Sequence, residues 1–319
     1  MSFPKNKEDA LKRVSEDGMA LEHAGEFKND KDVVLKAFEQ NPFSFSFAGS
    51  LVLDNREVVL TAVSQMGKLL FYASSRLKED KEVACAAIEN NPTALIYTSE
   101  SLRDDIDVVS RVINKDPHLI HQASTRVKGL KELILPAVKA DGGVLKYASP
   151  ECKADKEIVL AAVKTSESAI DCAADVFKHD AEVIAAALAF SGYALKYMPR
   201  DVQNQRDVVL AAIEKTPFAI RYASQELRGD KEVVLAACQK EGLAIMDASE
   251  ALREDPEVVL TAMRVNKGAL DFTTYKMKNF LKDFPEPMAK LQSMIEKEKL
   301  EAHCKGLLRS EPVLRGDVL

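Results

Sequence analysis

The stretch that decides the fold is DKEVVLAACQKEGLAIMDASEALRE, residues 230–254. It opens with Asp230, a residue type that caps helix N-termini well because its carboxylate accepts hydrogen bonds from unpaired backbone N–H groups. Val233, Val234 and Ala237 follow at i, i+1 and i+4, which places them on one face of a helix. A Gly, a second apolar segment and a Ser-Glu-Ala-Leu-Arg connector complete the stretch. It therefore predicts a helix of about three turns followed by a shorter helix of about two.

The same pattern recurs with a period of 25 residues, and the stretch DKEIVLAAVKTSESAIDCAADVFKH from Asp155 is a close copy. Ten copies begin in one register, at Asp30, Asn55, Asp80, Asp105, Leu130, Asp155, Asp180, Gln205, Asp230 and Asp255. A helix pair of this size cannot bury its apolar face alone, so neighbouring copies must stack. We therefore expect an all-α fold, an α-solenoid of two-helix repeats in which the second helix is short.

The consensus of the repeat is specific. Its first half reads D-[KR]-[DE]-V-V-L-x-A-V, and its second half reads ALxYAS followed by xLRxD. Over residues 30–279 this pattern resembles the repeat catalogued as domain of unknown function 4116 (DUF4116), departing from it at Leu130 and Gln205, which replace the opening Asp. The resemblance implies a helical repeat array and brings no catalytic activity or ligand with it. The unit is also weakly similar to leucine-rich variant repeats, which pair an α-helix with a 3₁₀-helix, so the type of the second helix stays open.

The two ends of the chain depart from the repeat. Residues 1–29 look like a degenerate N-terminal capping repeat, in which Glu8 and Asp9 stand at the Val positions. At the other end Pro285 and Pro287 interrupt the pattern. We expect residues 280–319 to form a C-terminal capping helix followed by a mobile tail.

The fifth repeat is irregular in sequence. Leu130 replaces its acidic cap, and Pro136 falls inside its first helix, where proline removes a backbone hydrogen bond and bends the chain. One interpretation is a hinge in the superhelix, and the other is sequence drift that the neighbouring repeats absorb. Proline bends are common in helices that have no hinge role, so we favour drift.

Composition limits the classes of function. The net charge of −6 and pI of about 5.6 argue against binding to nucleic acid or to anionic membranes through charge alone. No signal peptide or membrane-spanning apolar run is visible, and the five Cys show no CxxC spacing, so we expect a reduced, cytoplasmic protein without membrane insertion. Cys85 and Cys238 fall at core positions of the first helix, and Cys152 falls at the Leu position of the connector. We expect all three to be buried.

No catalytic or cofactor-binding motif appears in the sequence. His118 and His121 lie three residues apart and could join Asp116 in part of a metal site, but no further His or Cys lies near them in sequence. We therefore expect solvated histidines, a protein that is not an enzyme, and no metal or cofactor.

A basic column precedes the caps, at Lys78, Arg103, Lys128, Lys153, Lys178, Arg228, Arg253 and Lys278. Such a column could follow a nucleic acid. Each of the first seven has an acidic residue four positions later, as Arg103 has Asp107, which is the spacing of ion pairs along a helix. We favour the second interpretation, a ladder of internal ion pairs and contacts at helix C-termini.

Positions that vary between repeats are free to recognise a partner, and on the second helix these are its second and fifth steps. The apolar candidates form two clusters, one of Phe190, Tyr193, Phe218, Leu243 and Met246 and one of Phe43, Phe71 and Ile96. Exposed apolar patches often mark interfaces. The alternative is that packing between repeats buries these side chains, and the sequence favours neither.

The leading hypothesis is a scaffold, monomeric by preference, that binds a protein or peptide through the second-helix face. A second hypothesis is RNA binding, since helical repeats can read one base per unit and the Tyr of ALxYA recurs. We consider nucleic acid the weaker partner because the chain is acidic. A regulatory or effector role is a further alternative.

Overall fold

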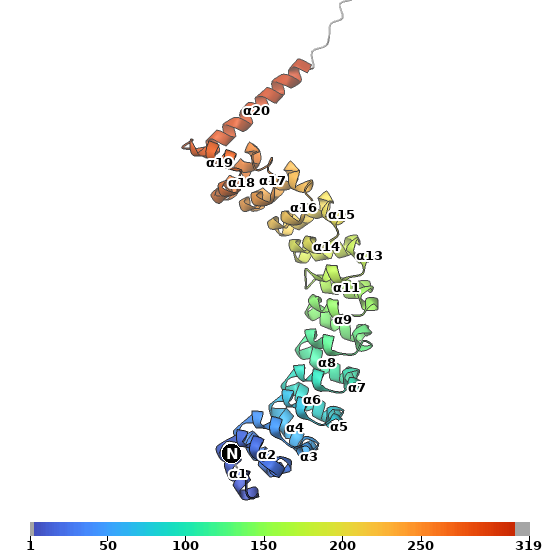
Figure 1. The fold of residues 1–319 in the computed structure, drawn as a ribbon. Helices are drawn as coiled ribbons and strands as arrows, with labels where there is room; N and C mark the ends of the chain where they lie inside the picture. Colours follow the sequence, from blue (N-terminus) through green and yellow to red (C-terminus); the bar gives the residue numbers. More distant parts are fainter. Residues whose placement is uncertain (1–2, 310–319) are drawn as a thin grey trace, which may run out of the picture. The chain divides into compact units, whose positions relative to one another are not determined.

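The computed structural model describes residues 3–309, with side chains described to residue 302. The chain divides into two compact units, Met1–Thr165 and Ser166–Leu319, which we call unit 1 and unit 2. Figure 1 shows short helices following one another along each unit, and residues 3–309 contain no β-strand. The prediction of an all-α repeat fold, an α-solenoid, is confirmed.

A repeat contains three short elements rather than two. In the repeat from Asp80, the first helix α6 spans Lys81–Asn90, the second helix η5 spans Pro92–Tyr97, and a third helix, α7, spans Glu100–Arg103. The third element occupies the Ser-x-x-Leu-Arg connector, which the sequence pattern indicated as a turn. Its Leu102 is buried, which anchors the connector on the core.

Unit 1 contains the N-terminal repeats. Its remaining first helices are α1 (Lys7–Glu16), α2 (Lys31–Gln40), α4 (Arg56–Gln65), α8 (Ile106–Lys115), α9 (Lys131–Ala140) and α11 (Lys156–Val163). Its remaining second helices are η1 (Gly18–His23), η3 (Pro42–Phe47), η4 (Gly67–Tyr72), η6 (Pro117–Gln122) and η8 (Gly142–Tyr147). Its connectors are η2 (Gly25–Asn29), α3 (Ser50–Leu53), α5 (Ser75–Lys78), η7 (Val127–Gly129) and α10 (Pro150–Lys153).

Unit 2 continues the same alternation. Its first helices are α14 (Ala181–Phe190), α16 (Arg206–Lys215), α17 (Lys231–Lys240) and α18 (Pro256–Val265). Its second helices are α12 (Ala169–Cys172), η9 (Gly192–Tyr197), η10 (Pro217–Tyr222), η12 (Gly242–Asp247) and η13 (Lys267–Phe272). Its connectors are α13 (Asp175–Lys178), α15 (Arg200–Gln203) and η11 (Leu227–Gly229), and the chain ends in α19 (Tyr275–Lys282) and α20 (Pro287–Arg309).

The first helix of each repeat forms where the sequence predicts it. In α6, the carboxylate of Asp80 accepts hydrogen bonds from the backbone N–H groups of Glu82 and Val83, over 3.0 and 3.1 Å. These bonds satisfy two donors that have no partner inside the helix. Val83 and Ala87 are fully buried where α6 packs against α4. The cap and the apolar face therefore define one helix that is stable only beside its neighbours.

A close approach between repeats explains the Gly or Pro that begins most second helices. A Cβ atom on Gly67 would lie 2.2 Å from the carbonyl oxygen of Ala87 in the next repeat, so a larger side chain does not fit. The N–H of Gly67 donates to the side-chain oxygen of Asn90 over 2.8 Å. Where Pro stands instead, as at Pro92, there is no N–H to satisfy.

The second helix is a 3₁₀-helix in every repeat between Asp30 and Asn279 except the one from Asp155. The sequence left this point open. A six-residue segment such as η5, with Asn91 as its cap and Pro92 at its first position, gains little from the wider α-helical turn, and short runs of this length are typical of 3₁₀-helices.

The irregular repeat in the structure is the sixth rather than the fifth. The helix with Pro136, α9, keeps the ten residues found in α8, so the proline does not break it. In the sixth repeat, α11 has eight residues and the second helix, α12, is α-helical. Glu167 stands there in the place of Pro or Gly. The unbroken α9 agrees with the favoured interpretation of Pro136 as absorbed drift, and the sequence did not predict the irregularity of the sixth repeat.

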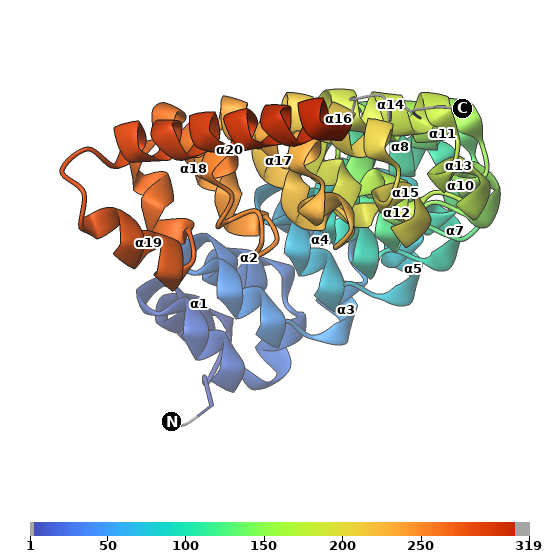
Figure 2. The same cartoon turned by 90° about the horizontal axis from the view of Figure 1, so that it is seen from above.

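Both ends of the repeat array carry their own structure. α1, η1 and η2 form a complete repeat on α2, capped by Asn6 and with Ala10 and Val14 in the core. α20 runs past α18 (Figure 2) and buries Leu291 and Ile295, whereas residues 296–302 are exposed. The expected mobile tail, residues 310–319, lies outside the described residues. Among the helices described, none has both the length and the apolar composition to cross a membrane.

Candidate functional site

The second helices of successive repeats pack side by side within each unit and form one face, which we call the second-helix face. In unit 2, η9 contacts η10, η10 contacts η12, and η12 contacts η13. A residue at a given step of one second helix therefore has its equivalent as a neighbour on the next. Residues at the same step of successive second helices therefore form a row along the unit.

A tyrosine at the sixth step of the second helix fills the space between neighbouring repeats. The ring of Tyr222 meets that of Tyr193, from the preceding repeat, edge to face at 6.2 Å between centroids. In unit 1, Tyr97 meets Phe71 in the same way at 5.4 Å. The recurring Tyr is thus a packing residue, a role that its recurrence in ALxYA could have indicated. The half-buried rings are poorly placed to stack freely on bases.

The predicted cluster in unit 2 separates into two groups. Tyr193, Phe218 and Leu243 occupy the second step of η9, η10 and η12, and all three are half-buried. For them the alternative interpretation, burial between repeats, holds in part. Phe190 and Met246 are 44% and 41% exposed, which is unusual for large apolar side chains. The structure therefore offers a row of half-buried apolar side chains on η9, η10 and η12, with Met246 exposed on η12 and Phe190 exposed at the end of α14.

The predicted cluster in unit 1 is more exposed. Phe43 is 67% exposed, Phe71 54% and Ile96 53%. Phe71 and Ile96 share the fifth step of η4 and η5, which pack side by side, and Phe43 lies at the second step of η3. This cluster belongs to unit 1, so the eight candidate residues form two separate patches.

The basic column lies beside the fifth step of the second helix. The Lys153 ammonium group donates to the carbonyl oxygen of Lys146, seven residues earlier, over 2.9 Å. Lys78 lies 5.6 Å from the ring centre of Phe71, again seven residues earlier. Gln203, at the equivalent place, donates to the carbonyl of Leu195 over 3.0 Å. These contacts confirm the part of the prediction that placed the column at helix C-termini.

Three arginines of this column keep a donor without a protein partner. The Nε atoms of Arg103, Arg228 and Arg253 are buried and have no hydrogen-bond acceptor. In unit 2 this places Arg228 and Arg253 beside the second-helix face with part of the guanidinium enclosed. Enclosure restricts the rotamers of these side chains.

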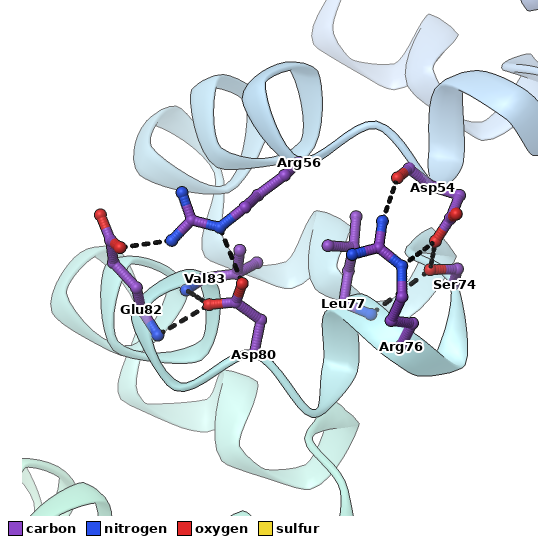
Figure 3. A network of polar contacts seen from close by, with 8 residues as sticks. All are labelled: Asp54, Arg56, Ser74, Arg76, Leu77, Asp80, Glu82 and Val83. Carbon is purple, nitrogen blue, oxygen red and sulfur yellow. Dashed lines mark hydrogen bonds and ion pairs between the residues drawn. The ribbon is translucent and has the colours of Figure 1, made fainter.

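The ion-pair ladder exists, but its basic members are not those of the basic column. Arg56, the first residue of α4, donates through Nε to Asp80 over 2.7 Å and through Nη2 to Glu82 (Figure 3). Equivalent pairs join Lys7 to Asp30 and Asp32, Lys31 to Glu57, Lys81 to Asp105 and Asp107, Lys131 to Asp155 and Glu157, Arg206 to Asp230 and Glu232, and Lys231 to Asp255 and Glu257. The predicted pairing of a column residue with the acid four positions later is wrong where that acid pairs instead with the first residue of the preceding first helix, as Glu82 does with Arg56 and Asp107 with Lys81.

The sequence carries a signal for this ladder that the repeat pattern alone does not reveal. Where Leu130 replaces the acidic cap, Ile106 replaces the basic residue of the preceding repeat. Where Gln205 replaces the cap, Ala181 stands in the basic position. Both members are lost together at the two exceptions, which indicates that the pair serves the architecture rather than a ligand.

The ladder also sets the protonation of the caps. The hydrogen bond from Arg56 holds the pKa of Asp80 below its ordinary value, although partial burial acts in the opposite direction. Lys131 lowers the pKa of Asp155 for the same reason. An ionised cap is the form that accepts the backbone N–H groups, so the ladder favours the capped helix.

A second polar network joins the connectors of successive repeats. Ser74 donates its hydroxyl proton to the carboxylate of Asp54, and the Nε of Arg76 donates to the same carboxylate over 3.1 Å (Figure 3). The Arg76 guanidinium also donates to the backbone carbonyl of Asp54 over 2.7 Å. Ser124, Arg126 and Asp104 repeat the arrangement. Both networks join successive repeats through the first helices and the connectors rather than through the second helices.

The histidine pair does not form a metal site. His118 pairs through Nε2 with Asp141 of the next repeat at 2.7 Å, and the ring of His121 bonds through Nδ1 to the carbonyl of His118 at 2.8 Å. Asp116 accepts from the backbone N–H of His118 and so acts as a cap. Within residues 3–302, no group of three or more His, Cys, Asp or Glu is placed to hold a metal ion.

The cysteines follow the core prediction in two of three cases. Cys152 and Cys238 are buried, and burial raises the pKa of Cys238 to about 12, so its thiol stays protonated at neutral pH. Cys85 is half-buried, so the prediction of a core position is wrong for it. It follows Ala84 on α6 and lies at the edge of the buried face. Neither buried thiol is poised as a nucleophile.

An apolar pocket beside the C-terminal helices has a volume of about 270 Å³ and is lined by Glu254, Lys276, Met277, Phe280 and Met294. Its rim carries the ion pair between Lys276 and Glu254 at 3.2 Å. The pocket is slightly smaller than common small-molecule sites, and the charged pair at its rim is satisfied. It holds no set of acid, base and nucleophile, so we base function on the second-helix face.

Comparison with known proteins identifies the repeat. A family whose description is "Domain of unknown function (DUF4116)" matches residues 6–51, 55–103, 80–128, 131–178, 180–228 and 230–278, and each match spans about two repeats. No curated protein and no solved structure matches the chain.

Proposed function

Since the chain belongs to the DUF4116 family, whose description assigns no activity, we propose from the surface itself that it is a non-catalytic scaffold that binds a protein or peptide. The binding region is the second-helix face of unit 2. The single observation that carries this proposal is the row of Tyr193, Phe218 and Leu243 together with the exposed Phe190 and Met246. Exposed large apolar groups beside a fixed apolar row are typical of interface centres.

Unit 2 is a better candidate than unit 1 because three of its apolar groups, Tyr193, Phe218 and Leu243, share one step of successive second helices and are partly held by packing. A side chain that is already restricted loses less conformational entropy on binding than a free one. The guanidinium group of Arg221 lies 5.7 Å from the ring centre of Phe218, which fixes the aromatic side chain further. The apolar groups of unit 1 lie at different steps of their second helices and are more exposed, and we treat that patch as secondary.

RNA binding is less well supported. Tyr193 and Tyr222 pack on each other between repeats, and Arg221 is engaged by Asp247 at 3.2 Å. A base-reading repeat needs free stacking residues and free polar groups at the same positions.

Site-specific photo-crosslinking tests the proposal. A photoreactive amino acid replaces Met246 on the second-helix face or, as a matched control, the exposed Gln239 on α17. We expect discrete protein adducts from a cell lysate at position 246 and not at 239, and we expect Phe190→Asp to reduce them. Equal labelling at both positions, or adducts that Phe190→Asp leaves unchanged, would contradict the proposed face.

A further inference from the structure

The spacing of the second-helix face limits the shape of a partner that contacts several repeats. Helices packed side by side lie about 8–10 Å apart, so Lys196, Arg221 and Met246, at the fifth step of η9, η10 and η12, recur at about that interval. An extended chain in the polyproline II conformation rises about 3.1 Å per residue with three residues per turn, and so presents the same side about every 9 Å. An α-helix presents the same side once per turn, about every 5.4 Å, so only every second turn, at about 10.8 Å, comes near the repeat spacing.

The charges beside this face favour an acidic partner. Lys196 is exposed, and the basic column supplies Arg228 and Arg253, whose enclosed Nε atoms have no acceptor. Two acids of this face form neutral pairs, Asp247 with Arg221 and Asp271 with Lys278, which leaves Lys196, Arg228 and Arg253 as basic groups outside these pairs. The face therefore carries an excess of positive charge on a chain whose net charge is −6.

The apolar groups indicate what the rest of the partner must supply. Met246 is exposed at the fifth step, and Phe218 and Leu243 form the half-buried row next to it. Methionine adapts to irregular surfaces, and a ring held under Arg221 offers a flat apolar contact. Each repeat can thus accept one apolar side chain, with a basic group beside it.

We propose that the partner presents an extended acidic segment with an apolar side chain at every third residue, and that successive apolar side chains meet successive repeats of unit 2. This inference rests on the proposed function and adds the conformation, the periodicity and the charge of the ligand. The backbone of such a segment stays solvated, and its acidic side chains lie against Lys196, Arg228 and Arg253.

Synthetic peptides test each part of the inference on the full-length protein. The probe is a fluorescent peptide of roughly four Glu-Leu-Pro triplets, which favours the extended conformation. One control has the same composition in an order that removes the three-residue spacing of Leu, and a second replaces every Glu by Lys. A labelled single-stranded oligouridine of similar charge is the third. Fluorescence anisotropy at physiological salt measures binding to the wild-type protein and to variants.

We expect the acidic triplet peptide to bind at least about tenfold more tightly than either peptide control and than the oligouridine. Met246→Asp should abolish the difference, whereas Gln239→Asp, on the exposed side of α17, should leave it unchanged. Arg228→Gln should weaken the binding of the acidic peptide and make that binding less sensitive to salt.

Equal binding of the ordered and reordered peptides would overturn the periodicity. Stronger binding of the lysine peptide would overturn the charge assignment, and preferential binding of oligouridine would replace the peptide with a nucleic acid. Failure of the triplet peptide together with strong crosslinking at position 246 would refute this inference and leave the proposed function standing. Failure of both tests would refute both.

Discussion

Arg56 and Asp80 bind each other across the boundary between two repeats, with 2.7 Å between the guanidinium Nε and the carboxylate Oδ2. The same carboxylate caps α6 through the N–H groups of Glu82 and Val83. Asp80 thus caps the N-terminus of α6 and also attaches this helix to the preceding repeat. Most repeats contain an equivalent contact, so the stacking of the array depends on polar pairs at one edge as well as on the apolar core.

Removing the cap should cost more than removing its basic partner. We expect Asp80→Ala to destabilise the protein by about 1–2 kcal/mol, because two N–H groups lose their acceptor. Arg56→Gln should cost less than about 1 kcal/mol, since its side chain is 42% exposed and surface pairs contribute little. Urea unfolding followed by circular dichroism gives both values. The double variant should be less destabilised than the sum of the two, and strict additivity would show that the pair does not couple the repeats.

Restoring the missing pair of the ladder should stabilise unit 1. Ile106 and Leu130 occupy, two repeats later, the positions that Arg56 and Asp80 hold in the ladder. We expect Leu130→Asp alone to gain about 1 kcal/mol from the new cap. Adding Ile106→Lys should give a further few tenths of a kcal/mol. Thermal unfolding measures the gain, and Ile106→Lys without the new Asp is the matched control. A drop in melting temperature for the double variant would show that apolar packing at this site is worth more than the pair.

Acid should weaken the array through its caps. Because the folded state lowers the pKa of Asp80 and Asp155 below the unfolded value, their contribution is complete above about pH 4. It is lost as the pH falls further and the folded carboxylates take up protons. We expect the urea midpoint to decline steeply below about pH 4, and Arg56→Gln should make the decline shallower. A midpoint that stays constant down to pH 2.5 would contradict this role for the caps.

The glycine at the start of a second helix should not tolerate a side chain. In Gly67→Ala the new Cβ would meet the carbonyl oxygen of Ala87 at 2.2 Å, and we expect a loss of about 1–3 kcal/mol. Gly229→Ala is a matched control, because its nearest contact would be the Ser249 hydroxyl at 3.8 Å. Chemical denaturation compares the two variants. Equal stability would mean that the repeats can separate locally to accept the methyl group.

The helices of this protein are predictable from sequence because their causes are local. An Asp followed by Val at helical spacing specifies a first helix in any repeat, and Asn91-Pro92 specifies the start of a second one. The third helix was missed because four residues such as those of α7 carry too little periodicity to be recognised. The α-helical second helix of the sixth repeat, α12, was also missed.

The candidate site was predictable only in outline. Variation at the second and fifth steps correctly indicated where exposed apolar groups such as Met246 lie. It did not reveal that Phe218 is half-buried or that the Tyr222 ring fills the gap between repeats, because these facts depend on how two repeats meet. The joint replacement of the basic and acidic residues by Ile106 and Leu130 shows that some of this information is present in the sequence once the register between repeats is known.

The half-buried and exposed members of the candidate face should respond differently to charge. Phe218 is half-buried on η10 with Arg221 over its ring, so Phe218→Asp removes packing between repeats and should cost about 1–3 kcal/mol. Met246 is exposed, and Met246→Asp should change stability by less than about 0.5 kcal/mol. Thermal unfolding of both variants, with Gln239→Asp as a surface control, separates the two roles. Met246→Asp is then the variant suited to binding assays, because a loss of partner cannot be attributed to unfolding. A large destabilisation by Met246→Asp would show instead that this side chain packs between repeats and that the free surface of unit 2 is smaller than we propose.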